Sequence, residues 1–238
     1  MSELIFDYQK RLDRTEQKKQ LLLAWLVDFT WTTPEIAGQL MGLITRAGIN
    51  KTLKQFQNAG LIKEAFLVLA DNRKLRIIGI TPNGLLWCDD NEMAIDKPSF
   101  DPGRVALSTI IHRLDVQRCR LKVNQLGIEW VAENNYPKKI TYRPDAIINI
   151  HDKSIALELE RTAKTKKRYQ QIITQHLRQI NQGAYSQVHY VSTVDGFAQR
   201  LERLFNSINK LSVRGQQVLF SDDLKQRFKF YDFDNWSI

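Results

Sequence analysis

Three acidic residues gather in one short stretch of the chain and are the residues best suited to chemistry. Asp145 precedes an apolar segment, and Glu158 and Glu160 follow it after a turn. Because side chains alternate along a strand, a tight turn centred on Asp152 and Lys153 predicts a β-hairpin with Asp145 opposite Glu160 and Glu158 on the same face. The other face is entirely apolar and predicts a core face, so the acids should point outward together; it comprises Ala146, Ile148, Ile150, Ile155, Leu157 and Leu159.

Carboxylates held this close together either share a proton or bind a cation. Hard oxygen ligands in this number suit Mg²⁺ or Mn²⁺. A zinc site is not indicated, because Cys88 and Cys119 are isolated and the histidines are scattered along the chain. We therefore predict a divalent-metal site formed by Asp145, Glu158 and Glu160.

A strongly basic segment follows the acids directly. Residues 161–169 contain Lys164, Lys167 and Arg168, and a helix is predicted from residue 165 to residue 182. Acidic residues that could bind a metal, followed by basic residues that could bind phosphate, are suited to cleavage of a phosphodiester. Lys164 would stabilise charge on the phosphate at the start of this helix, with Lys167 as its rival, and Lys167 and Arg168 would contact DNA. The competing interpretation is an ordinary amphipathic hairpin with a solvated acidic face, followed by a basic helix that aids solubility.

The hairpin resembles the PD-(D/E)xK nuclease core. The matching residues are Pro144-Asp145 and Glu158-Leu159-Glu160, and Glu160 stands where the pattern expects a lysine. The resemblance implies that Asp145 and Glu158 are the principal metal ligands and that Glu160 is a ligand or base. It also allows the missing lysine to have moved onto the following helix, where Lys164 is the first candidate.

The first ninety residues predict a winged helix-turn-helix. A helix is expected over 15–29, a second begins at Pro34 after the capping residue Thr33, and a third spans 45–59 and ends at Gly60. Two β-rich runs follow, 61–70 and 74–81. Three helices followed by a hairpin is the winged-helix order.

The third helix of this domain carries a polar face suited to a DNA major groove. Its candidate DNA-binding residues recur at helical spacing and are joined by two at the tip of the wing: Arg46, Asn50, Lys51 and Lys54, then Arg73 and Lys74. A winged helix used for protein contact or dimerisation is the alternative.

Residues 93–104 predict a linker, because they contain Pro98, Pro102 and Gly103 without apolar periodicity. The predicted organisation is therefore a winged-helix domain over 1–92 and a nuclease-like α/β domain with a mixed sheet over 105–238. The second domain should contain a helix over 105–123, the acidic hairpin, the basic helix, a strand over 188–193, a helix over 195–211 and a strand over 217–220. The aromatic residues of 228–236 would form a docking tail or a strap folded onto the core.

His112, on the helix over 105–123, is a candidate to orient the nucleophile or the scissile phosphate. The alternative is a partly buried polar contact with Asp115, one turn further along the helix. The identity of the nucleophile stays open between water and a tyrosine, for which Tyr142, Tyr169 and Tyr8 are the candidates.

Composition agrees with a polyanionic partner. The chain has 238 residues and a formal charge of +9, with a pI near 9.5, and such a surplus favours nucleic acid. Isolated cysteines indicate a reduced, cytoplasmic protein. No apolar run approaches the length of a membrane span, so membrane insertion is not expected.

A winged helix followed by this acidic site resembles the MobC-type plasmid relaxases and, more loosely, the replication-relaxation proteins. The specific part is Arg143-Pro144-Asp145, the segment from Glu158 to Lys164, and Arg168-Tyr169. The resemblance implies metal-dependent, strand-specific nicking of a transfer origin in supercoiled plasmid DNA, with an accessory relaxosome protein and a coupling protein as further partners. The alternatives are a non-catalytic regulator of plasmid replication or transcription and a restriction-like double-strand endonuclease.

Overall fold

The computed structural model describes residues 2–93, 98–131, 136 and 140–238. The chain is a mixed α/β protein with two compact units, residues 1–117 and 118–238, each with its own sheet and core. The predicted boundaries, with a linker over 93–104, stay a prediction, and residues 94–97 of that segment lie outside the described residues. Just beyond them, Phe100 is buried against Gly79 of the N-terminal unit.

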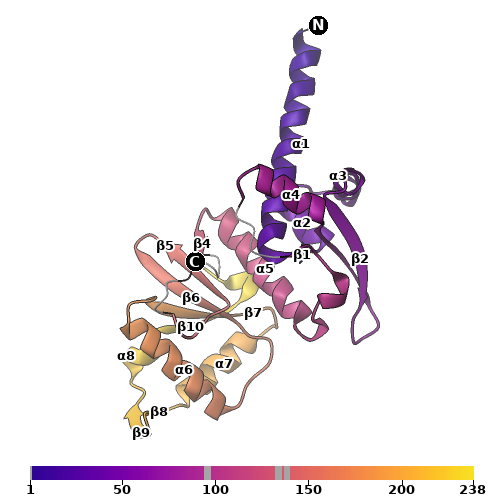
Figure 1. The fold of residues 1–238 in the computed structure, drawn as a ribbon. Coiled ribbons are helices and arrows are strands. Elements are labelled where there is room, and N and C mark those ends of the chain that lie inside the picture. The colour runs from indigo at the N-terminus through magenta and orange to yellow at the C-terminus, as the bar shows by residue number, and fades with distance from the viewer. Residues whose placement is uncertain (1, 94–97, 132–135, 137–139) are drawn as a thin grey trace. The chain divides into compact units, whose positions relative to one another are not determined.

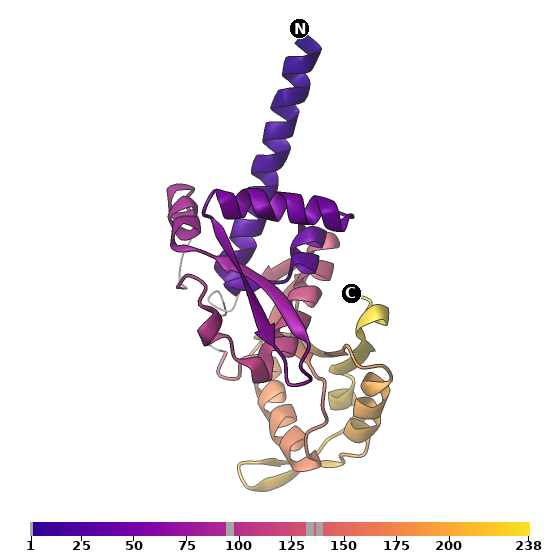
Figure 2. The ribbon, with the colours of Figure 1, turned by 90° about the vertical axis from the view of Figure 1, so that its right-hand side faces the viewer.

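The N-terminal unit combines four helices with a small antiparallel sheet in the order β1-β3-β2. Its elements are α1 (Ser2–Phe29), β1 (Trp31–Thr32), α2 (Pro34–Leu40), α3 (Arg46–Asn58), β2 (Ile62–Val68), β3 (Lys74–Ile80) and α4 (Pro82–Asp90). The first helix begins well before the predicted residue 15, because no glycine or proline interrupts it. Its first half projects from the rest of the unit (Figures 1 and 2).

Threonine residues cap three helices of this unit, α2, α3 and α4. The hydroxyls of Thr33, Thr45 and Thr81 each accept a hydrogen bond from the backbone N–H three residues later, which satisfies one of the donors left open at a helix start. Gly60 has a φ of +71° directly after α3, a conformation that costs glycine little and ends the helix. The positions of the second and third helices and of the hairpin are thus confirmed.

The C-terminal unit contains a five-stranded mixed sheet in the order β10-β7-β6-β5-β4. Its strands are β4 (Glu129–Val131), β5 (Ala146–Ile150), β6 (Lys153–Leu159), β7 (Gln187–Ser192) and β10 (Phe228–Asp232). β4, β5 and β6 pair antiparallel, whereas β6, β7 and β10 pair parallel. The remaining elements are η1 (Pro102–Arg104), η2 (Leu107–Thr109), α5 (Ile110–Gln125), which crosses the boundary between the units, α6 (Lys166–Asn181), α7 (Phe197–Asn206), β8 (Lys210–Val213), β9 (Gln216–Leu219), α8 (Asp222–Lys225) and η4 (Phe233–Asn235).

The central hairpin exists, but its predicted register is wrong by two residues. Ile150 pairs with Lys153 and Ile148 with Ile155, so the turn consists of His151 and Asp152, and His151 has a φ of +50°. A shift of two residues keeps every side chain on its predicted face. It does change the cross-strand partners of the acids.

The expectation that the acids point outward is also wrong, because both faces of the hairpin are buried. Ile147 and Ala156, on the face of the acids, belong to the main core together with residues of α6 and α7. The opposite face is buried as well, as Ala146 and Leu157 illustrate. β5 and β6 are interior strands of the sheet, so neither face is left to solvent.

The C-terminal aromatic segment forms an edge strand of the five-stranded sheet. Phe228–Asp232 is strand β10, which pairs parallel with β7, and Phe228 and Trp236 are buried. The strap folded onto the core is thus confirmed in preference to the docking tail. The predicted last strand lies in the separate β8–β9 hairpin, outside the five-stranded sheet, and α7 ends at Asn206, earlier than predicted.

His189 on β7 supports a prediction about acid stability. Its Nδ1 accepts a hydrogen bond from the indole N–H of Trp236 at 3.3 Å, and burial, with a smaller effect of Lys229, lowers the pKa of His189 to about 4. Because the folded pKa lies below the unfolded value, the neutral ring stabilises the fold above about pH 6.5, and this stability is lost as the pH falls toward 4.

We expect protonation of His189 to remove about 2 kcal/mol from the free energy of unfolding between pH 7 and pH 5. Urea unfolding at both pH values should therefore show a smaller loss in His189→Gln than in the wild type. Equal losses would contradict the assignment.

Within the described residues, no helix has both the length and the apolar character that crossing a bilayer requires.

Candidate functional site

The acids meet where β5 begins and β6 ends. Asp145 directly precedes β5, and continuing the observed register by one residue places it opposite Glu158 on β6. Its Oδ2 accepts a hydrogen bond from the backbone N–H of Leu159 at 2.8 Å. Glu160 follows the strand, and its N–H donates to the carbonyl of Val191 on β7. The sheet thus brings the three predicted acids together, with Asp145 facing Glu158 where Glu160 was expected.

Glu158 is held in an environment that opposes its charge. Its side chain and that of Glu160 are buried, with 8% and 5% of their residue surfaces exposed. Burial raises the pKa of Glu158 well above its ordinary value, and the negative charges of Asp145 and Glu160 raise it further, while Lys164 acts in the opposite direction. The surroundings of Glu158 therefore disfavour its ionised form.

Lys164 lies at the acids, but not on the helix. α6 begins at Lys166 with Thr165 as its N-cap, so Lys164 belongs to the loop between β6 and α6, and its predicted place in the first helical turn is wrong. Its ammonium forms an ion pair with Glu160, and its backbone N–H donates to the hydroxyl of Tyr169 at 3.3 Å. The short loop between β6 and α6 and the hydrogen bond to Tyr169 together hold Lys164 beside the carboxylate of Glu160.

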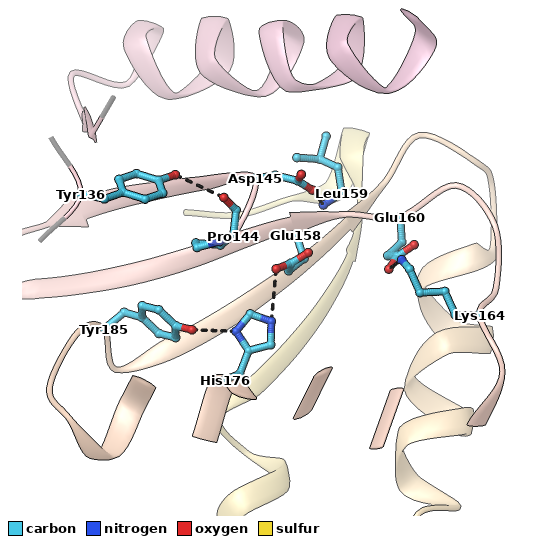
Figure 3. A network of polar contacts seen from close by, with 9 residues as sticks. All are labelled: Tyr136, Pro144, Asp145, Glu158, Leu159, Glu160, Lys164, His176 and Tyr185. Atoms are coloured by element: carbon cyan, nitrogen blue, oxygen red, sulfur yellow. Dashed lines mark hydrogen bonds and ion pairs between the residues drawn. The ribbon is translucent and has the colours of Figure 1, made fainter. Parts of the chain in front are cut away.

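His176 is a residue of the site that the motif search missed. It lies on the inner face of α6 and is fully buried, with its Nε2 3.2 Å from Oε1 of Glu158. Its Nδ1 lies 2.8 Å from the hydroxyl of Tyr185, so the three side chains form a chain of polar contacts (Figure 3). Burial lowers the pKa of His176 to about 3, which keeps the imidazole neutral.

Two of the candidate tyrosines border the acids. The hydroxyl of Tyr142 hydrogen bonds to Glu158, and burial followed by the charge of Glu158 raises the pKa of Tyr142. Burial likewise raises the pKa of Tyr169 to about 12. Both phenols are protonated at neutral pH, so either would have to lose its proton before acting as a nucleophile. The side chain of Tyr8 lies outside the described residues.

His112 lies on α5 in the N-terminal unit, whereas the acids lie in the C-terminal unit. Its role in catalysis stays a prediction. Its neighbour on the helix, Asp115, is buried.

The predicted DNA-binding side chains of the N-terminal unit differ in their availability. Arg46, Lys51 and Lys54 are exposed on α3. Asn50 is partly buried, and its Oδ1 accepts a hydrogen bond from Arg76 at 2.7 Å, which ties α3 to strand β3. Arg76 also pairs with Glu64 of β2 at 2.6 Å.

In the turn between β2 and β3, Arg73 pairs with Asp71 at 2.6 Å, and both side chains are exposed. Such a pair exchanges easily with a phosphate, because surface ion pairs contribute little stability. Lys74 is exposed at the start of β3, and Lys167 and Arg168 are exposed in the first turn of α6.

In the described part of the chain, the histidine, cysteine, aspartate and glutamate side chains form no group of three arranged to hold a metal ion. Glu160 is turned to Lys164, which leaves Asp145 and Glu158 as the carboxylates not paired with that lysine. Their oxygens still form the hard donor set that Mg²⁺ and Mn²⁺ prefer.

Comparison of the chain with models of protein families, with curated proteins and with solved structures found no match.

Proposed function

We propose that this chain is a metal-dependent DNA endonuclease that nicks one strand of supercoiled plasmid DNA at a transfer origin. The observation that carries the proposal is the pair of carboxylates, Asp145 and Glu158, held opposite each other with Glu158 in surroundings that disfavour its charge. A buried carboxylate beside a like charge costs stability, and binding of a divalent cation would relieve that cost. If the chain is a MobC-type plasmid relaxase, its partners would include an accessory relaxosome protein and a coupling protein.

The architecture of the C-terminal unit supports this proposal. A helix precedes three antiparallel strands, and α6 then connects β6 to the parallel strand β7. This order is the one expected for a PD-(D/E)xK core with Asp145 and Glu158 on its central hairpin. The N-terminal unit, with three helices and the β2–β3 hairpin, has the order expected for a winged helix.

Each acidic residue of the site and Lys164 would have a distinct role in the reaction. Asp145 and Glu158 would hold Mg²⁺ or Mn²⁺, and Glu160 would either join them or act as a base. The cation would supply Lewis acidity and activate the nucleophile. Lys164 would stabilise the negative charge that develops on the phosphate, since turning Glu160 toward the cation would release its ammonium.

Nicking of plasmid DNA tests the proposal. We expect the purified protein to convert supercoiled plasmid carrying its origin to open circles with Mn²⁺ or Mg²⁺ and to leave it intact with EDTA. Linear products would favour the restriction-like endonuclease. A gel shift without cleavage at any metal concentration would overturn the enzymatic proposal.

A non-catalytic DNA-binding regulator is the second candidate, because protein groups already engage the acids. Lys164 pairs with Glu160, and the backbone of Leu159 donates to Asp145. A nuclease-like fold without activity would keep such contacts permanently.

The winged helix supports a separate prediction. Replacing Arg46 and Lys51 by alanine should weaken DNA binding and flatten its salt dependence by about one phosphate contact per residue. Both side chains are exposed on α3, so the fold should be unaffected. A matched control, Arg14→Ala with Lys18→Ala on α1, removes the same charge away from α3. Equal affinities and salt slopes in the two double variants would point to a winged helix that binds protein.

A further inference from the structure

We propose that His176 is a positioning residue, which together with Tyr185 fixes the carboxylate of Glu158 in the orientation needed to bind the cation. This inference rests on the proposed nuclease function. It assigns a role to a side chain sixteen residues beyond Glu160 in the sequence, on the helix that covers that face of the sheet.

The contacts place the imidazole directly behind the carboxylate. Nε2 of His176 lies 3.2 Å from Oε1 of Glu158, and Nδ1 lies 2.8 Å from the hydroxyl of Tyr185. When that hydroxyl donates to Nδ1, the proton of the neutral ring resides on Nε2 and faces the carboxylate. Figure 3 shows both contacts converging on the ring from opposite sides.

The surroundings of the ring prevent it from turning away. Aromatic rings pack edge-on around the imidazole, with centroid distances of 4.8 Å to Tyr142, 5.9 Å to Tyr185, 6.3 Å to Tyr190 and 6.1 Å to Phe228. Since the helix and these rings fix His176, the position of its Nε2 is set before any ligand arrives. A fixed donor of this kind preorganises the carboxylate that it contacts.

The contact between His176 and Glu158 is not explained by a contribution to stability. Oε1 of Glu158 and Nε2 of His176 are both buried and lack hydrogen bonds of good geometry, although they face each other at contact distance. Burying polar atoms with imperfect partners costs free energy that an apolar side chain would avoid. Retaining such a pair at a candidate metal ligand fits a role in positioning.

The experiment uses the full-length protein and four variants. His176→Leu removes the ring nitrogens, His176→Gln keeps an N–H near the position of Nε2, and Tyr185→Phe removes the hydroxyl that holds Nδ1. Tyr231→Phe is the matched control, because it removes a hydroxyl from a ring on β10 that packs against His189. Calorimetry measures Mn²⁺ binding without DNA, plasmid nicking measures activity, and thermal unfolding checks the fold.

We expect His176→Leu to weaken Mn²⁺ binding by about 10-fold to 100-fold, with a parallel loss of nicking at low Mn²⁺. His176→Gln should recover most of the affinity, Tyr185→Phe should lie between them, and Tyr231→Phe should match the wild type. Unchanged Mn²⁺ affinity in His176→Leu and Tyr185→Phe would overturn the positioning role. So would equal weakening in folded His176→Gln and His176→Leu. A wild-type protein that binds no Mn²⁺ would instead overturn the proposed function, and this inference with it.

Discussion

Alanine at Asp145 or at Glu158 is expected to abolish nicking of supercoiled plasmid while leaving sequence-specific DNA binding close to that of the wild type. Each change removes a proposed ligand from the hairpin and leaves the exposed residues of α3 untouched. Because a bound cation contributes several kcal/mol of transition-state stabilisation, the nicking rate should fall by at least about a hundredfold. Gel shifts and nicking assays on the same preparations separate the two activities.

Glu158→Gln extends this prediction to stability. Burial and the nearby charges raise the folded pKa of Glu158, so the group stabilises the fold below its unfolded pKa, and this stability is lost as the pH rises through the folded pKa. At neutral pH the amide should therefore raise the melting temperature while nicking is lost, as expected for a strained functional site. Glu202→Gln, on the exposed side of α7, is the matched control. Wild-type nicking in the Asp145 and Glu158 variants would remove the site assignment, and a lower melting temperature in Glu158→Gln would contradict the charge argument.

The alternation of residues was enough to predict the hairpin and to group the acids on one face. It was not enough to fix the register, because a turn at Asp152 and Lys153 and a turn at His151 and Asp152 both satisfy period-two alternation. The observed turn requires a positive φ at His151, which is uncommon for residues other than glycine.

The burial of the acids could not be deduced from the hairpin alone. A sequence pattern predicts acidic residues to be exposed, because charged groups are rarely buried without partners. Only the placement of α6 and α7 over this face shows that Glu158 faces the core. The burial of the acids therefore depends on long-range packing and could not be predicted from the local sequence pattern.

A signal for His176 was present in the sequence. Tyr169, Ile172, Ile173 and His176 recur at helical spacing and are all buried on α6, so a helical projection places the histidine on the core-facing stripe. Its contact with Glu158 could not be predicted in the same way. That contact depends on how α6, which connects β6 to the parallel strand β7, packs on the sheet.

Lys164→Ala is expected to lower the nicking rate by on the order of a hundredfold or more at saturating Mn²⁺. The proposed reaction builds negative charge on the phosphate, and Glu160 occupies the position where the nuclease pattern expects the lysine that would offset it. Lys164 already lies at the acids, where its ammonium pairs with Glu160 and its backbone is tied to Tyr169. Its side chain is 40% exposed, so a phosphate can reach it.

Lys166→Ala is the matched control, because its ammonium donates to the carbonyl of Ser207, away from the acids, at 2.7 Å. This change removes the same charge two residues away and should reduce nicking only mildly. Lys164→Arg should retain more activity than Lys164→Ala if positive charge is the requirement. If Lys167→Ala is the severe variant and Lys164→Ala is mild, the first turn of α6 supplies the charge in place of the loop before it. If no lysine of this segment matters, the offsetting charge must come from a second metal ion or from His112, and the displaced-lysine hypothesis fails.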